Sequence, residues 1–184
     1  MRDRPERLST RRGYEGRFLN VDIETIRNPV GQTVDLEIIR HPGAAAVVPM
    51  LSGPGTEDPF VLLLRQYRYA AEGMIWEIPA GVMEPGESPA DCARRELEEE
   101  TGARANNVER LTTIYTTPGF TDERIHLFLA TGLEVGETNH EEDELIYVES
   151  RPLSKVLEMI RDGDIVDGKS IVALLFVAGF TLNR

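Results

Sequence analysis

Cysteine, tryptophan and histidine are scarce in this chain of 184 residues, which contains one Cys, one Trp and three His. The single cysteine, Cys92, has no second cysteine with which to form an intramolecular disulfide, so we expect a cytoplasmic protein in a reducing compartment. Long hydrophobic runs are also lacking, because the strongest one, residues 171–180, is too short to cross a bilayer. The Arg-rich first dozen residues do not contain the apolar stretch of a secretory signal.

The chain also lacks an excess of positive charge. Its 20 Lys and Arg residues against 32 Asp and Glu residues give a formal net charge of −12. Nucleic acids and anionic membranes bind mainly to clustered Lys and Arg, so this balance argues against both as partners. The basic start of the chain could form an RNA-binding arm, but acidic residues intersperse it. We therefore expect a mobile tail over residues 1–13.

What the chain does contain is a dense acidic cluster. Residues 96–100 include four glutamates, directly after a pair of arginines. On a helix, Glu96 would face both Glu99 and Glu100, and like charges at these spacings repel each other. The last turn of a helix also disfavours anions. A bound divalent cation with a preference for oxygen ligands, such as Mg²⁺ or Mn²⁺, would offset this repulsion, so the cluster predicts a metal site.

Both ends of the acidic segment carry helix signals. Ser88 is a good N-cap residue, Pro89 fits the first helical position, and Gly102 can adopt the left-handed conformation that ends a helix. These signals predict a helix over residues 89–101, in which Arg95 and Glu99 lie four residues apart and can pair.

The same segment resembles a known family motif. The Nudix box, G-x5-E-x7-R-E-U-x-E-E-x-G-U with U aliphatic, is matched over residues 81–103 by Gly81, Glu87, Arg95, Glu96, Leu97, Glu99, Glu100 and Gly102. Only Ala103 departs from it, being smaller than the usual aliphatic residue. We attribute Gly81 and Gly86 to backbone turns, which glycine tolerates. The resemblance implies a Nudix fold: a mixed β-sheet in an α/β/α sandwich, with the box as a loop–helix–loop and an N-terminal β-hairpin extension.

Strand and helix signals alternate along the rest of the chain, which is typical of a mixed sheet covered by helices. We expect one domain over residues 1–184, with N-terminal strands over 14–42 joined by a turn at 28–31. The remaining strands are expected at residues 44–51, 60–67, 76–79, 111–116, 124–130 and 145–149, and two further helices at 153–161 and 170–182.

The resemblance also implies a set of metal ligands. Nudix hydrolases cleave nucleoside diphosphates linked to another group, and Mg²⁺ is the expected ion, with Mn²⁺ as a substitute. Glu96 and Glu100 are implied as direct ligands, Glu99 as a ligand or the holder of a coordinated water, and the Ala80 carbonyl as a further ligand. Arg95 is expected to orient Glu87 or Glu99 rather than to touch substrate.

Flanking segments resemble the ADP-ribose pyrophosphatase subgroup over roughly residues 44–182. The segment TPGFTDE at 117–123 is similar to the subgroup's S-P-G-x-x-x-E, with Thr117 where serine is usual, and implies substrate contacts at Thr117, Pro118 and Glu123. Arg68 is a candidate diphosphate contact because a planar guanidinium suits phosphate oxygens; the alternative is a surface arginine at a strand end. Trp76 is expected in the core rather than stacked on a base.

A second acidic segment, Glu141-Glu142-Asp143-Glu144, precedes the last expected strand, at residues 145–149. The subgroup places a catalytic or metal-binding glutamate on a loop in this region. Glu142 and Glu144 are the preferred candidates for the general base, with Glu141 behind them, and the alternative is a solvated loop. The three histidines are given no catalytic role, and nothing resembles a nucleophilic triad.

Together these features predict a metal-dependent hydrolase that cleaves the pyrophosphate bond of ADP-ribose to give AMP and ribose 5-phosphate. The alternatives are another small nucleoside diphosphate derivative, such as a GDP-sugar or a dinucleoside polyphosphate, or a non-catalytic Nudix ligand sensor. The subgroup also implies a homodimer, formed through the N-terminal strands.

Overall fold

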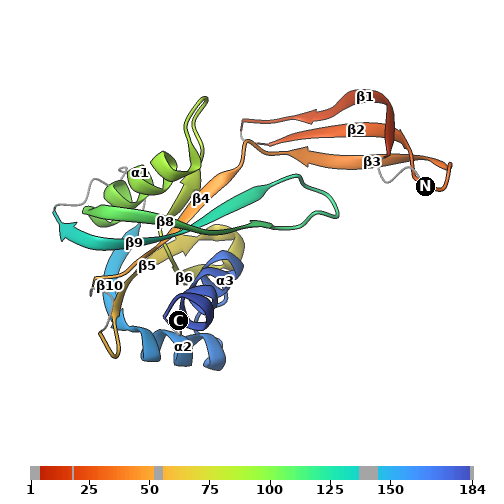
Figure 1. Cartoon of the computed structure of the whole chain (residues 1–184). Coiled ribbons are helices and arrows are strands. Elements are labelled where there is room, and N and C mark those ends of the chain that lie inside the picture. Colours follow the sequence, from red (N-terminus) through yellow and green to blue (C-terminus); the bar gives the residue numbers. More distant parts are fainter. Residues whose placement is uncertain (1–4, 18, 52–55, 137–144, 183–184) are drawn as a thin grey trace. The chain divides into compact units, whose positions relative to one another are not determined.

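The computed structural model describes residues 5–17, 19–51, 56–136 and 145–182 (Figure 1). Contacts within the chain divide it into two compact units, where one domain was expected. The first unit contains Met1–Gly43 and Tyr115–Arg124, and the second contains Ala44–Ile114 and Ile125–Arg184. The segment 115–124 thus belongs with the N-terminal strands, although the strands that flank it run into the second unit.

The first unit is built on an antiparallel sheet of β1 (Glu6–Glu15), β2 (Asn20–Arg27) and β3 (Thr33–Arg40), in that order. The turn between β2 and β3 lies where the sequence predicts it. There the Asn28 side-chain oxygen accepts hydrogen bonds from the backbone N–H groups of Val30, at 3.1 Å, and Gln32, at 2.9 Å. Asparagine commonly stabilises tight turns in this way.

Strand β1 occupies residues for which the sequence predicts a mobile tail. Pairs of opposite charge join it to β2: Arg12 to Asp22 at 2.7 Å, and Glu6 to Arg27 at 3.1 Å. Cross-strand ion pairs of this kind favour strand pairing. The acids and bases of this segment therefore pair with opposite charges on the neighbouring strand, and do not form a solvated tail.

The segment 115–124 is fastened to the end of β3. The Ile39 N–H donates to the Phe120 carbonyl at 2.8 Å, and the Asp122 N–H donates to the Ile39 carbonyl at 3.3 Å. The Arg40 guanidinium also donates to the Asp122 carboxylate at 2.7 Å. A loop expected to recognise substrate is thus held by both backbone and side-chain contacts to the N-terminal sheet.

The second unit contains two sheets, with strand orders β10-β5-β6 and β7-β4-β9-β8. Their strands are β4 (Ala44–Pro49), β5 (Phe60–Arg68), β6 (Gly73–Glu77), β7 (Ala80–Val82), β8 (Ala103–Tyr115), β9 (Arg124–Val135) and β10 (Ile146–Pro152). Strand β4 is antiparallel to β7 and parallel to β9. The second sheet is therefore mixed, as predicted.

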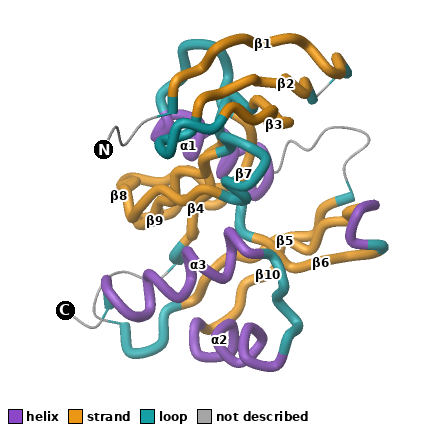
Figure 2. The backbone as a smooth tube through the Cα atoms, turned by 90° about the vertical axis from the view of Figure 1, so that its right-hand side faces the viewer, coloured by secondary structure: helices purple, strands orange, loops and turns teal. Residues whose placement is uncertain are grey.

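Helices cover both faces of β4 (Figures 1 and 2). They are α1 (Pro89–Thr101), α2 (Leu153–Asp162) and α3 (Gly168–Phe176); a short 3₁₀ turn (Tyr69–Ala71) follows β5, and a π-helical turn (Val177–Thr181) follows α3. Val47 of β4 packs in one core cluster with Leu97 of α1, whereas Val48 packs in another with Val156 of α2 and Leu174 of α3. Successive side chains of β4 thus point to opposite faces of the sheet and pack in two different cores, which confirms the α/β/α sandwich. No helix in the described ranges has the length and apolar character needed to span a membrane.

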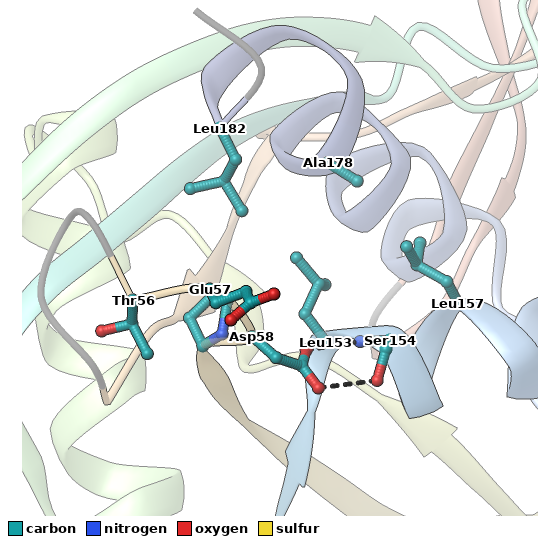
Figure 3. A pocket seen from close by; sticks show the side chains of 9 residues that line it. Thr56, Glu57, Asp58, Leu153, Ser154, Leu157, Ala178 and Leu182 are labelled. Atoms are coloured by element: carbon teal, nitrogen blue, oxygen red, sulfur yellow. Dashed lines mark hydrogen bonds between the residues drawn. The ribbon is translucent and has the colours of Figure 1, made fainter.

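Helix α2 follows Pro152, whose side chain offers no cap. Asp58 caps it instead, accepting from the Ser154 N–H at 2.9 Å and from its hydroxyl at 2.7 Å (Figure 3). Beside this contact lies a cavity of about 500 Å³, lined by Thr56, Glu57, Asp58, Pro59, Leu153, Ser154, Leu157, Ala178 and Leu182. None of these lining residues belongs to the acidic segment of α1. The cavity is therefore not the site formed by that segment.

Candidate active site

The helix that carries the acidic cluster has the predicted bounds. At its start, the Ser88 hydroxyl oxygen accepts from the Asp91 N–H at 3.2 Å and the hydroxyl donates to the Asp91 carboxylate at 2.6 Å. At its end, Gly102 has a left-handed φ of 69°, and its N–H donates to the Glu98 carbonyl. Local capping signals were therefore sufficient to place α1.

Glu96 lies against Gly81 of β7. A Cβ atom built on Gly81 would overlap the Glu96 carboxylate, so only glycine leaves room for this contact. Gly81 is not among the residues with a left-handed φ, whereas Gly86 is, with a φ of 85°. The attribution of Gly81 to a backbone turn is therefore wrong, because its role is close approach, and the attribution of Gly86 is confirmed.

Glu100 contacts the residue next to Gly81. Its side-chain oxygen accepts a hydrogen bond from the Ala80 N–H at 3.0 Å, and the residue is only 6% exposed. Residues four apart on a helix share one face, so Glu96 and Glu100 meet two successive residues of β7. Three of the four expected metal ligands, these two glutamates and Ala80, are thus brought together.

Arg95 lies among the carboxylates of the box. Its Nη1 donates to Glu96 at 2.6 Å and to Glu99 at 3.0 Å. Its Nε and Nη2 donate to the two oxygens of Glu87 at 2.9 and 3.1 Å. The structure therefore places Arg95 against both residues that it was expected to orient.

These contacts and burial shift several pKa values. Hydrogen bonds from Arg95 lower the pKa of Glu87 to about 2, and the same bonds raise the pKa of Arg95. Burial raises the pKa of Glu96, an effect that Arg95 opposes. Burial also raises the pKa of the Cys92 thiol to about 12, so this cysteine packs as a small neutral core residue.

The donor set fits a hard divalent cation. Glu96, Glu99, Glu100 and the Ala80 carbonyl offer only oxygen, which Mg²⁺ and Mn²⁺ prefer. Within the described residues, no three Asp, Glu, His or Cys side chains are close enough to hold an ion. The positive charge beside Glu96 and Glu99 is instead the Arg95 guanidinium.

A second charged cluster surrounds Glu77, the last residue of β6. One Glu77 oxygen accepts from Arg68 Nε at 2.8 Å, and the other accepts from Lys169 Nζ at 2.6 Å. Sequence reasoning singled out Arg68 but missed its partner Glu77 and the second cation on that carboxylate, Lys169, which lies 92 residues from Glu77. The available signal was an acidic residue, Glu77, inside an otherwise apolar segment.

The segment at 117–123, expected to contact substrate, belongs to the first unit. The Thr117 carbonyl accepts from the N–H groups of Phe120 and Thr121, each at 3.1 Å, and Pro118 beside it is exposed. Glu123 accepts from the Thr116 hydroxyl at 2.8 Å. These bonds close the segment into a compact turn.

The three candidate bases, Glu141, Glu142 and Glu144, lie outside the described residues. Trp76 is partly buried and packs against the core cluster that contains α2 and α3. The guanidinium carbons of Arg65 and Arg151 each lie 5.8 Å from the centre of its ring, within the range of cation–π contacts.

Comparisons with known proteins indicate the family to which this chain belongs. A family profile described as the NUDIX domain matches residues 40–172. The chain is 38% identical to a methanol dehydrogenase activator of Bacillus methanolicus, covering 92% of this chain and 90% of that protein. It is 37% identical to an ADP-ribose pyrophosphatase of Bacillus subtilis (89% and 87% covered) and 37% identical to a GDP-mannose pyrophosphatase of Cronobacter sakazakii (76% and 79% covered).

A crystal structure of an ADP compounds hydrolase has the same fold, with a TM-score of 0.80 at 23% identity over 95% of this chain and 92% of that one. The profile covers more than half of the chain and includes the whole cluster of α1 and β7. The chain therefore belongs to the Nudix hydrolases.

Proposed function

We propose that this Nudix hydrolase cleaves ADP-ribose at its pyrophosphate bond. One observation supports the chemistry above all others: Glu96 and Glu100, on one face of α1, contact the successive residues Gly81 and Ala80 of β7. This arrangement places two carboxylates beside β7, and we infer that a divalent cation bound there holds the diphosphate.

The reaction adds one water across the P–O–P bridge. The water oxygen becomes bonded to one phosphorus, the bridging oxygen leaves with the other, and the two products are AMP and ribose 5-phosphate. When bound, a divalent cation would polarise phosphoryl oxygens and lower the pKa of water. Glu96, Glu99, Glu100 and the Ala80 carbonyl are the residues proposed to hold Mg²⁺, or Mn²⁺ in its place.

Other residues are proposed to bind substrate and to move the proton. Arg68 would contact the diphosphate, because 43% of its side chain is exposed and guanidinium groups suit phosphate oxygens. Thr117, Pro118 and Glu123 would shape the pocket for the terminal ribose. The base that accepts the water proton would be Glu142 or Glu144, with Glu141 as the third candidate.

ADP-ribose is preferred because the segment at 117–123 resembles the corresponding segment of ADP-ribose pyrophosphatases. Overall identity does not choose the substrate, since relatives named for ADP-ribose and for GDP-mannose are both 37% identical. A GDP-sugar therefore remains the second candidate.

A coupled phosphatase assay tests the proposal. Alkaline phosphatase releases phosphate from the monoesters AMP and ribose 5-phosphate but not from intact ADP-ribose. With Mg²⁺, the protein should make ADP-ribose a source of phosphate at a higher kcat/KM than GDP-mannose or diadenosine polyphosphates. A better GDP-mannose rate would change the substrate assignment, and binding of ADP-ribose without hydrolysis would favour a ligand sensor.

We further propose that the protein is a cytoplasmic homodimer formed through the N-terminal sheet. Every residue of β1 is exposed, and only Glu24 is buried in β2. A three-stranded sheet is stable only when an apolar face is covered by another part of the protein or by a partner. The apolar side chains of Leu8, Tyr14 and Leu36 are exposed in this sheet and could contact a second subunit. Light scattering after size-exclusion chromatography should give twice the chain mass, and a monomer mass would exclude this arrangement.

A further inference from the structure

Glu77 is a buried carboxylate shared by two cations from different elements. Its side chain is 5% exposed, and its partners are Arg68, at the end of β5, and Lys169, in the first turn of α3. The Lys169 contact is the shorter, 2.6 Å against 2.8 Å. A buried carboxylate needs such partners because desolvation penalises an unpaired charge.

Lys169 is held from two sides. Besides Glu77, its Nζ contacts Asp167 at 3.1 Å, and its side chain is 13% exposed. The same Asp167 oxygen accepts from the N–H and the hydroxyl of Ser170. The Ser170 oxygen in turn accepts from the Ile78 N–H at 2.9 Å. The start of α3 is therefore locked to residues 77–78, with the ammonium group fixed in place.

Arg68 differs from Lys169 in its exposure and in its unused donors. It contacts Glu77 through Nε alone, and in the described part of the chain neither of its terminal nitrogens has a hydrogen-bonding partner. A guanidinium has five N–H donors, so four of them are not used by the described residues. Arg68 and Lys169 together balance the charges of Glu77 and Asp167, so the cluster is neutral as a whole. Without Lys169 it would carry a net negative charge, which would oppose the binding of an anion at Arg68.

We propose that Lys169 is a positioning residue for Arg68: it fixes and neutralises the Glu77 carboxylate, so that the Arg68 guanidinium is oriented and charged to bind the substrate diphosphate. This inference rests on the proposed function, in which Arg68 contacts the diphosphate. It predicts that Lys169 affects substrate binding without touching substrate. A merely structural Lys169 would instead affect stability and leave the KM of the folded enzyme unchanged.

A double-mutant cycle tests the proposal with Mg²⁺ and either ADP-ribose or GDP-mannose as substrate. Lys169→Met should raise KM about tenfold for both substrates while kcat changes less than about twofold, the pattern of lost uniform binding. Lys169→Arg should restore most of the affinity. In an Arg68→Ala background, Lys169→Met should change KM little, because the two residues act as one unit. Lys155→Met, at an exposed lysine of α2, is the matched control and should be silent.

Several results would overturn this inference. If Lys169→Met raises KM equally with and without Arg68, the residues act independently, while Arg68 remains a substrate contact. If Arg68→Ala alone leaves KM unchanged, both the proposed contact and the inference fail. If Lys169→Met does not fold, Lys169→Gln retains a donor without the charge, and a wild-type KM in that variant would exclude the proposed role.

Discussion

Arg95 binds both oxygens of Glu87 through two parallel hydrogen bonds, from Nε at 2.9 Å and from Nη2 at 3.1 Å. This bidentate pair joins the loop that precedes α1 to the middle of the helix. Such pairs combine charge with fixed geometry and are among the stronger polar contacts in proteins. The pair also leaves Nη1 of Arg95 to reach Glu96 and Glu99, so one guanidinium serves three carboxylates.

The Glu87 pair should make folding sensitive to acid. The pKa of the Glu87 carboxyl is about 2 in the folded chain, below the ordinary value of 4.5, so ionised Glu87 stabilises the fold above pH 4.5. This stability is lost as the pH falls from about 5 to 2, and is at most about 3 kcal/mol. The free energy of unfolding, measured with denaturant at several pH values, should fall less over this pH range in Glu87→Gln than in the unmodified protein. Glu109→Gln, at an exposed residue of β8, should behave like the unmodified protein.

Glu100 should control the response to metal. Glu100→Gln can still accept from the Ala80 N–H, but it removes a charge from the proposed ligand set. We expect turnover to fall by at least about a hundredfold in saturating Mg²⁺, on the scale of lost electrostatic stabilisation. The rise in melting temperature on adding Mg²⁺ should also shrink, because a ligand stabilises the state it binds. An unchanged rate and an unchanged Mg²⁺ shift would refute this assignment.

Gly81 provides a steric test of the same site. Gly81→Ala places a Cβ where the Glu96 carboxylate lies, so the carboxylate must move. We expect about a hundredfold loss of activity together with a stability cost of about 1–3 kcal/mol from overpacking. Gly73→Ala is the matched control, since a Cβ there meets no atom within 4 Å and its φ is not left-handed. Equal activity in the two variants would show that the approach of Glu96 to Gly81 is dispensable.

The acidic segment at 141–144 should contain the general base. Replacing the correct residue among Glu141, Glu142 and Glu144 with glutamine should lower kcat by about 10² to 10⁴ while ADP-ribose affinity is largely retained. The other two variants should be nearly silent. Turnover and equilibrium binding measured for each variant separate these effects, and three silent variants would make the segment a solvated loop.

The segment at 117–123 should control which substrate is preferred. Pro118→Ala loosens the turn closed by the Thr117 carbonyl, so the group recognised there is held less accurately. We expect kcat/KM to fall more for ADP-ribose than for dinucleoside polyphosphates, with Arg68→Ala as the comparison, because a phosphate contact should affect both alike. A Pro118→Ala variant with equal losses on both substrates would argue against ribose recognition.

Elements with strong local signals were predictable from the sequence. Helix α1 matches its predicted bounds because Ser88, Pro89 and Gly102 encode its ends. Strand β8 was predicted only from residue 111 but begins at Ala103. Its first half is polar and includes Asn106 and Asn107, which disfavour strands, and pairing with β9 outweighs that preference.

The site was predictable in its residue types but not in its contacts. The spacing of the box indicated which carboxylates share a helix face, whereas the packing of Glu96 on Gly81 depends on how α1 meets β7. The bridge from Lys169 to Glu77 depends on how α3 meets β6. Such contacts arise from the packing of one element against another, about which periodicity and capping rules contain no information.

Strand β4 separates the two cores of the second unit, and this has a consequence for how that unit unfolds. Because the successive residues Val47 and Val48 are each fully buried in a different core, both cores depend on the position of β4. Its parallel pairing with β9, as between Ala46 and Leu127, joins distant parts of the chain, so the central sheet should form slowly. Backbone amides of β4 should accordingly exchange with deuterium only through global unfolding, and the unit should melt as a single cooperative body.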